Sequence, residues 1–242
     1  MAQHNNMSNI IFISDLHLSP ENGTTLADFQ QFLVAHAAKA DKLFILGDLF
    51  EAWIGDDNID ACTQAVAKSL QALKKQGKKI YYMHGNRDFL LGNAYAEQCG
   101  MEVLPDPFVL KVDGQKIVLT HGDLLCTDDH SYQKFRRTVH QPWLQKLFLR
   151  LPLVFRQKIA CFLRSKSMNA GPKKSSEMMD VNEAAVTEVM VKYGCKVMIH
   201  GHTHKPARHE LDYGRRYVLG AWDEKFAILH YEDGDFFLQF SP

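Results

Sequence analysis

The sequence IIFISDLH at residues 10–17 joins a run of apolar residues to the polar residues Asp15 and His17. A short apolar run is typical of a buried strand, and carboxylate and imidazole groups are metal ligands. Four later stretches repeat this order: KLFILGD (42–48), KIYYMHGNRD (79–88), KIVLTHGD (116–123) and KVMIHGHTH (196–204). Ligands of α/β sheets bind beyond the carboxyl ends of the strands, so we expect the five polar clusters to meet in space.

Helical and turn patterns lie between and after these strands. We expect helices near residues 24–39, 59–76, 93–99 and 181–192, a hairpin at 108–112 and 116–120, and late strands near 215–219, 226–231 and 236–240. Strands that alternate with helices and are followed by hairpins predict a mixed α/β layered fold. No linker divides the chain, so we expect a single domain over residues 1–242.

The composition excludes several classes of protein. Of the 242 residues 46% are hydrophobic and 15 are Phe, which excludes a disordered chain. The best apolar candidate, Leu144–Phe155, is broken by Lys146, Arg150 and Pro152 and is too short to span a bilayer. A polar start predicts no secretory signal, and five cysteines without a CxxC pair predict a reducing compartment. We therefore expect a soluble cytosolic protein.

Equal numbers of acidic and basic residues conceal an uneven distribution of charge. The chain has 28 Lys and Arg and 28 Asp and Glu, but residues 129–180 hold eleven of the bases and three of the acids. This segment carries a charge of +8 and the rest of the chain carries −8. A basic segment on an acidic body is expected to face an anionic partner, such as phosphates or a membrane surface.

The residue types that follow the strands indicate a metal centre. Carboxylate, imidazole and amide oxygen donors suit Mn²⁺, Fe or Zn²⁺. The five clusters contain no cysteine, which argues against a structural zinc site of the cysteine type. A single Asp-x-His pair occurs by chance, whereas five clusters in order at five strand ends are a specific signal.

The clusters D-x-H, G-D, G-N-R-D, H-G and G-H-x-H resemble, in this order, those of the calcineurin-like metallophosphoesterase superfamily over most of the chain. The longer stretches FISDLHLS, ILGDLFEAWIGDD, YYMHGNRDFLLG, THGDLLCTDD and IHGHTHKPA resemble, within it, the UDP-2,3-diacylglucosamine pyrophosphatases of lipid A synthesis. The resemblance implies two mixed β-sheets flanked by helices, with an inserted helical hairpin that forms a lid at residues 129–180.

The resemblance also implies two Mn²⁺ ions per chain. One ion is expected on Asp15, His17, Asp48 and His204, and the other on Asp48, Asn86, His121 and His202. Catalytic roles are implied for Asp48, Asn86, Arg87 and His121. In the family reaction, water attacks the α-phosphorus of UDP-2,3-diacylglucosamine and gives UMP and 2,3-diacylglucosamine 1-phosphate.

Arg87 replaces the His that many superfamily members have after the Asn of this motif. An arginine keeps its charge and cannot act usefully as a proton donor. We expect it to bind phosphate oxygens through two N–H groups and to stabilise charge in the transition state. The alternative is a surface salt bridge to Asp88, a residue that could also cap the N-terminus of a helix.

Residues 129–180 are expected to determine specificity. Apolar residues recur at helical spacing on both sides of Pro152, which predicts two amphipathic helices with a basic rim. Such a face can hold acyl chains and lie on a membrane surface, or it can pack on the body. The resemblance implies substrate contacts by Asn86, Arg87, Asp129, Tyr132, Arg164, Ser167, Lys174 and His202.

Some residues near the clusters keep two interpretations. His84 and His200 are expected to be structural, because the ligand positions are filled without them. Asp123 either orients a ligand or occupies a turn. Three acids follow Asp48 closely: Glu51, Asp56 and Asp57. One of them supports the site, or all three belong to a solvated loop.

Three functions compete at this point. The first is hydrolysis of UDP-2,3-diacylglucosamine by a monomer bound peripherally to the cytoplasmic face of the inner membrane, with that lipid nucleotide and its lipid product as ligands and no nucleic-acid partner. The second is a generic dimetal phosphoesterase that acts on a soluble nucleotide or a phosphoprotein. The third is a scaffold without activity, against which the intact ligand clusters argue.

Overall fold

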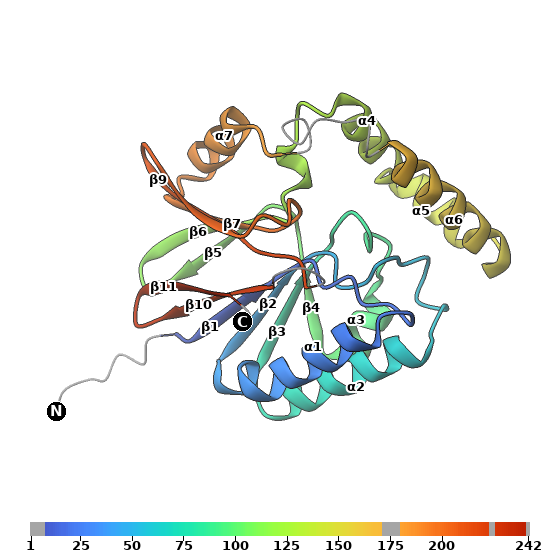
Figure 1. Cartoon of the computed structure of the whole chain (residues 1–242), viewed down its shortest axis with the longest axis horizontal. Coiled ribbons are helices and arrows are strands. Elements are labelled where there is room, and N and C mark those ends of the chain that lie inside the picture. The colour runs from blue at the N-terminus through green and yellow to red at the C-terminus, as the bar shows by residue number, and fades with distance from the viewer. Residues whose placement is uncertain (1–7, 171–179, 223–225, 241–242) are drawn as a thin grey trace.

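Two β-sheets face each other, and helices cover their outer surfaces (Figure 1). The computed structural model describes residues 8–170, 180–222 and 226–240, and the side chains of α6 as far as residue 165. The expected layered α/β fold with two mixed sheets is confirmed.

The six-stranded sheet has the order β11-β10-β1-β2-β3-β4. Strands β1 to β4 are parallel, β10 is antiparallel to β1, and β10 and β11 form an antiparallel pair. The strands are β1 (Ile10–Ile13), β2 (Lys42–Leu46), β3 (Lys79–Met83), β4 (Met101–Leu104), β10 (Ala227–Glu232) and β11 (Asp235–Phe240). Strand β4 was not expected from the sequence.

The five-stranded sheet has the order β5-β6-β7-β9-β8. Strands β6, β7 and β9 are parallel, and β5 and β8 are antiparallel edge strands. The strands are β5 (Phe108–Val112), β6 (Gln115–Leu119), β7 (Val197–His200), β8 (Ala207–Leu211) and β9 (Gly214–Val218). The expected hairpin is β5 and β6, whereas β8 was not expected.

Strand β1 shows how the two sheets share the hydrophobic core. Its residues are all buried, and they alternate between two clusters. Ile11 and Ile13 pack under the helices, while Ile10 and Phe12 lie between the sheets. This alternation explains the uninterrupted apolar run, because both faces of the strand are covered.

Helices cover the outer face of each sheet (Figure 1). Helices α1 (Gly23–Ala35), α2 (Ala61–Lys75) and α3 (Asn93–Cys99) pack on the six-stranded sheet, and α7 (Glu183–Tyr193) packs on the other. The start of α2 is fixed by a capping box: Asp60 accepts a hydrogen bond from the Thr63 amide, and the Thr63 hydroxyl accepts one from the Asp60 amide. Two short 3₁₀ turns complete the set, η1 (Ala37–Lys39) and η2 (Asp123–Leu125).

Three further helices, here called the cap helices, project beside the sheets (Figure 1). They are α4 (His130–Val139), α5 (Pro142–Leu149) and α6 (Leu153–Ala170). Helices α5 and α6 match the two helices expected on either side of Pro152, and α4 adds a third. Among the described residues, no helix is long and apolar enough to cross a bilayer.

A buried arginine attaches α6 to the body of the protein. Arg156 is 2% exposed, and its Nη1 donates hydrogen bonds to the Ile54 carbonyl (2.5 Å) and to Asp57 Oδ1 (2.8 Å). Its Nη2 also pairs with Asp57, and its Nε donates to the Leu151 carbonyl at 2.9 Å. The loop after β2 is therefore tied to the cap helices. The sequence left open whether Asp57 supports the site or lies in a solvated loop, and its contacts with Arg156 show that it anchors α6.

The first prediction concerns this attachment. Replacing Arg156 by Met should remove the hydrogen bonds and lower the free energy of unfolding by about 1–3 kcal/mol. The cap helices should become sensitive to limited proteolysis while the sheets stay folded, as measured by circular dichroism. Arg150→Met is the matched control, because Arg150 is exposed in the connection between α5 and α6. Equal protease sensitivity of the two variants would contradict the anchoring role.

Candidate metal centre

The polar clusters leave their strands in an unusual backbone conformation. Five of their residues have positive φ angles: Asp15 (55°), His17 (50°), Asp48 (51°), His202 (70°) and His204 (57°). This left-handed region is unfavourable for residues other than glycine, and it persists where the surrounding structure imposes it. Hydrogen bonds between loops do so here: the Asp15 amide donates to the Gly47 carbonyl and the His17 amide to the Asp48 carbonyl, at 3.1 and 3.0 Å.

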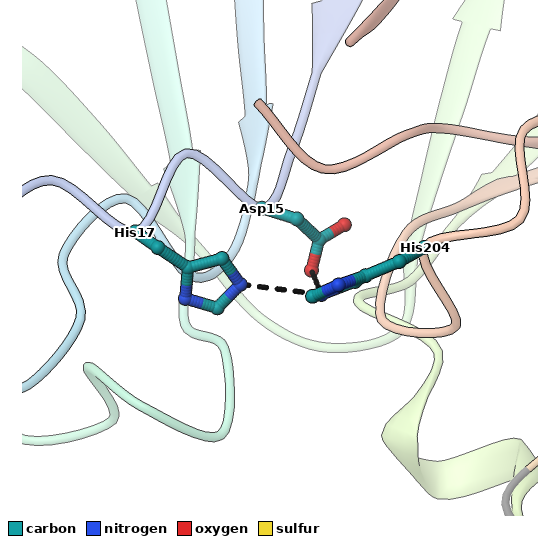
Figure 2. Close-up of side chains that lie close together, drawn as sticks. All are labelled: Asp15, His17 and His204. Carbon is teal, nitrogen blue, oxygen red and sulfur yellow. Dashed lines mark hydrogen bonds and ion pairs between the residues drawn. The ribbon is translucent and has the colours of Figure 1, made fainter. Parts of the chain in front are cut away.

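The first group of predicted ligands converges beside the end of β1 (Figure 2). His17 Nε2 lies 3.2 Å from His204 Nε2, and His204 Nε2 lies 3.5 Å from Asp15 Oδ1. One donor atom from each of these three residues falls within a sphere suited to a single metal ion. Residues separated by nearly the whole chain are thus brought together, as the strand-end pattern predicts.

The second group meets at the Asn86 side chain. Asn86 Oδ1 lies 2.9 Å from His121 Nε2 and 2.8 Å from His202 Nδ1. Asp48 Oδ2 lies 3.7 Å from His121 Nε2 and 3.9 Å from His17 Nε2. Asp48 therefore stands between the two groups, which is the position required of a shared ligand.

Glycines allow the loops to approach this closely. A Cβ atom on Gly85 would lie 2.1 Å from Asp48 Oδ1, and one on Gly201 would lie 2.2 Å from Asp15 Oδ2. Both carboxylates occupy the space that a side chain at these positions would take. The close packing fixes the carboxylates before any ion binds.

Asp88 has a different role from either that was expected. Its carboxylate is fully buried and accepts hydrogen bonds from the backbone amides of Asp48, Leu49, Phe50 and Gly85, at 2.7 to 3.3 Å. The Arg87 side chain does not pair with it and lies 3.7 Å from Glu51 instead. Asp88 is neither a salt-bridge partner nor a helix cap; it joins the loops after β2 and β3.

The electrostatics of the centre favour a bound cation. Burial alone would lower the pKa of His121, but the carboxylates of Asp48, Asp15 and Asp123 raise it to about 9. Burial raises the pKa of Asp48 to about 6, against the opposing influence of His121 and His17. Three buried carboxylates therefore surround one imidazole, and this negative potential attracts a proton or a metal ion to the same place.

Glu51 connects the centre to the cap helices. Its carboxylate lies 3.1 Å from His17 Nδ1, 3.0 Å from Arg164 Nη2 of α6 and 3.7 Å from Arg87 Nη1. A carboxylate on the second nitrogen of a metal-binding imidazole fixes the ring and its tautomer. Of the three acids left open by the sequence, Glu51 is the one beside the site, since Asp56 accepts hydrogen bonds from the Gly92 and Tyr95 amides at the start of α3.

Helix α4 contacts the other side of the centre. Asp123 is buried, and its Oδ2 accepts hydrogen bonds from the Tyr132 hydroxyl (2.7 Å) and from Arg136 Nε (2.6 Å). The Tyr132 ring stacks on His202 with 6.1 Å between centroids. Asp123 lies in the 3₁₀ turn η2, as one of the two interpretations expected, and it holds α4 with the Tyr132 ring beside the predicted ligand His202.

Of the remaining predicted substrate contacts, the structure describes the side chains of Asp129 and Arg164. Asp129 caps α4, where its Oδ1 accepts a hydrogen bond from the Tyr132 amide at 3.0 Å. Arg164 is half exposed and reaches the centre through Glu51. The Ser167 side chain and the whole of Lys174 fall outside the described residues.

Three residues beside the ligands have structural contacts. His84 Nε2 lies 2.7 Å from the Leu91 carbonyl, and buried His200 lies 2.8 Å from the Gly201 carbonyl through its Nδ1. Both agree with the expected structural role. Asp106, which was not expected at the site, accepts a hydrogen bond from the His121 amide at 3.4 Å, and burial raises its pKa to about 6. An Asp-Pro pair before a strand gives too weak a signal to identify it.

Carboxylate, imidazole and amide donors lie around a shared aspartate at the rim of two facing sheets. This arrangement is that of a metallophosphoesterase-type protein. The chain belongs to the calcineurin-like phosphoesterase family, which it matches over residues 8–206, and it is a hydrolase of that family. A solved archaeal phosphodiesterase has the same fold, with a TM-score of 0.51 at 11% identity over 96% of this chain and 99% of its own.

Curated relatives are much closer in sequence. The UDP-2,3-diacylglucosamine hydrolase of Pectobacterium carotovorum is 52% identical over 90% of this chain and 93% of its own length. Those of Serratia proteamaculans and Escherichia coli O81 are each 50% identical over 88% of this chain, and over 91% and 90% of their own lengths. The similarity thus covers the sheets and the cap helices alike.

The second prediction tests the packing of Asp48. Gly85→Ala should displace the Asp48 carboxylate, because the added Cβ would overlap it, and should weaken Mn²⁺ binding by about tenfold or more. Isothermal titration calorimetry measures the affinity. Gly23→Ala is the control, since a Cβ there meets nothing within 4 Å. Unchanged affinity in Gly85→Ala would show that this carboxylate is not needed for binding.

Proposed function

We propose that this chain hydrolyses the diphosphate of UDP-2,3-diacylglucosamine, as a step of lipid A biosynthesis. Water attacks the α-phosphorus and the products are UMP and 2,3-diacylglucosamine 1-phosphate. The observation that carries the proposal is the presence, on one chain, of candidate metal-ligand groups and of cap helices with exposed apolar side chains. Relatives about half identical over some nine tenths of the chain bear the name of this reaction.

Two Mn²⁺ ions are the proposed cofactors. Asp15, His17, Asp48 and His204 would hold one, and Asp48, Asn86, His121 and His202 the other. The donors fit, because they are oxygen and imidazole groups without cysteine and two of the carboxylates are fully or nearly fully buried beside imidazoles. When bound, such a pair supplies an activated water and neutralises charge on the phosphates.

Two arginines would bind the diphosphate. Arg87 and Arg164 both pair with Glu51, at the edge of the centre. Phosphate oxygens offer these guanidinium groups stronger charge-assisted hydrogen bonds than one shared carboxylate does. Arg87 would stabilise the charge that develops at the α-phosphorus, and Asn86, Asp48 and His121 complete the proposed catalytic set.

The substrate would lie between the centre and the cap. Residues 129–180 form the proposed lid within one domain, with substrate contacts from Asp129, Tyr132, Arg164, Ser167, Lys174 and His202. Asp129 and Tyr132 stand at the start of α4, and the Tyr132 ring stacks on His202. This arrangement leaves the sugar close to the diphosphate and the acyl chains nearer to α5 and α6.

The cap helices are suited to acyl chains. Helices α4 and α5 contain no buried residue, and large apolar side chains stay exposed along α5 and α6, among them Trp143 (65%), Phe155 (58%) and Phe162 (65%). Basic residues lie on the same helices. An apolar face with a basic rim binds the interface of an anionic membrane, so we propose peripheral association of a monomer with the cytoplasmic face of the inner membrane.

A soluble nucleotide or a phosphoprotein is the weaker alternative. It would use the same metal ligands, so the centre does not distinguish the two. A soluble substrate, however, gives no physical reason for a group of exposed aromatic side chains beside the centre. The cap helices therefore favour the lipid nucleotide.

The third prediction tests the reaction directly. Hydrolysis of UDP-2,3-diacylglucosamine in water enriched in ¹⁸O should place the label in UMP, because the oxygen of the attacking water stays on the phosphorus that it attacks. Mass spectrometry of both products measures this. Label in 2,3-diacylglucosamine 1-phosphate would mean attack on the β-phosphorus, and absence of turnover with Mn²⁺ bound would reject the substrate.

The fourth prediction separates the cap from the chemistry. The double variant Phe155→Ser, Phe162→Ser should raise the KM for the diacyl substrate by about tenfold or more, since it removes apolar contact surface. Hydrolysis of bis-p-nitrophenyl phosphate should change little, because a small diester needs only the metal centre. Val34→Ser, at an exposed position of α1, is the control. A parallel loss on both substrates in a folded variant would show that the cap only supports the centre structurally.

A further inference from the structure

The proposed substrate has two halves, and the cap helices account for one of them. The cap is anchored on the loops that follow β2 and β6, through the pairs Arg156–Asp57 and Arg136–Asp123. The diphosphate at the centre must also lead to a nucleoside, which needs space in another direction. Figure 1 shows the cap helices on one side of the molecule and α7 with β9 on the other.

A cavity of about 790 Å³ opens on that other side. Its wall includes Thr203 and Lys205, which alternate along the chain with the predicted ligands His202 and His204. We call this space the β8–β11 cavity, after the two edge strands that contribute to it: Ala207 and His209 of β8, and Phe240 of β11. A volume of this size accommodates a nucleotide.

Strand register places the cavity at the same rim as the metal centre. Val218 of β9, which lines it, pairs with His200, the last residue of β7 before the ligand loop. Phe240 pairs with Ala227 of β10. Ala227 precedes Leu229 by two residues, and Leu229 pairs with Phe12 of the antiparallel strand β1. Phe240 therefore stands level with the carboxyl end of β1, where Asp15 begins the first cluster.

The lining of the cavity offers three kinds of contact. Arg216 is 6% exposed, its Nε has no hydrogen-bond partner among the residues that the structure describes, and its Nη1 is 3.4 Å from His200 Nε2. A buried guanidinium with an unused N–H is costly unless an acceptor reaches it. The Phe240 ring is half exposed, and Glu183 at the start of α7 presents an exposed carboxylate.

We propose that the β8–β11 cavity binds the uridine half of the substrate, an inference that rests on the proposed function. The uracil ring stacks on Phe240, its carbonyl oxygens accept hydrogen bonds from Arg216, and the ribose hydroxyls donate to Glu183. The substrate then spans the rim, with its lipid half under the cap helices and its nucleoside half in the cavity. The metal centre lies between the two, at the diphosphate.

The test is the binding of UMP to the Mn²⁺-loaded protein, measured by isothermal titration calorimetry. Phe240→Ala should weaken UMP binding by about tenfold, because stacking of a base on an aromatic ring is lost. Phe237→Ala is the matched control: Phe237 is exposed on the same strand and is not part of the cavity wall. Inorganic phosphate, which needs only the metal centre, should bind the wild type and both variants equally.

Product inhibition provides a second test, in which the cavity variant and the cap variant should each affect a different product. In Phe240→Ala the inhibition constant of UMP should rise about tenfold while that of 2,3-diacylglucosamine 1-phosphate stays the same. In the Phe155→Ser, Phe162→Ser variant the inhibition constant of 2,3-diacylglucosamine 1-phosphate should rise while that of UMP stays the same. Arg216→Lys keeps the charge but loses the planar donor group, and it should also weaken UMP binding.

The outcomes separate this inference from the proposed function. Equal UMP affinity in Phe240→Ala and Phe237→Ala, with turnover of the lipid nucleotide intact, overturns the uridine site and leaves the proposed function standing. UMP binding that is weakened by Phe240→Ala in a protein that does not hydrolyse the lipid nucleotide rejects the proposed function and keeps a nucleotide site.

Discussion

The arrangement of the centre depends on the hydrogen bonds that the Asp88 carboxylate accepts. It is buried, yet it accepts hydrogen bonds from four backbone amides, three in the loop after β2 and one in the loop after β3. These loops carry Asn86, around which the second group of predicted ligands gathers, and Asp48, which stands between the two groups. Without Asp88 the buried amides would lack partners, so the loops would separate or admit water.

The left-handed backbone at the predicted ligands is a second constraint on the centre. Left-handed conformations at Asp15, His17, Asp48, His202 and His204 each have a cost, and two facing sheets hold them in place. The side chains meet at the rim of the two sheets, where the Asp15 and Asp48 carboxylates lie close enough to repel one another. A cation at that place relieves the repulsion, which is why the same groups raise the pKa of His121 to about 9.

The sequence predicted the strands that are buried on both faces and missed two of the four edge strands, β4 and β8. Strands β1 and β7 are buried throughout and appear as plain apolar runs. Edge strand β8 alternates partly and fully exposed residues, ARHEL, and its charged residues concealed it. Short β4, which contains the exposed residue Glu102, was missed for a similar reason.

The convergence of the ligand clusters was predictable because it follows from strand direction alone. The contacts that support the clusters were not, because they join residues far apart whose types suit many roles. Asp88 reaches back about forty residues to the loop after β2, and Glu51 reaches forward to Arg164 of α6. Nothing local in the sequence distinguishes Glu51 from Asp56 or Asp57; only the fold assigns one to the centre, one to α3 and one to α6.

These supporting contacts mean that the cap and the centre are not independent units. Asp57, which holds α6 through Arg156, follows Asp48 in one loop, and Asp123, which holds α4 through Arg136, lies two residues after His121. Glu51 lies between His17 and Arg164 and adds a third connection. A displacement of the cap helices therefore acts on loops that carry predicted ligands, and tightening of those ligands around an ion acts on the cap. The contacts that would select the substrate and those that would cleave it share the same short loops, so the geometry of one limits the geometry of the other.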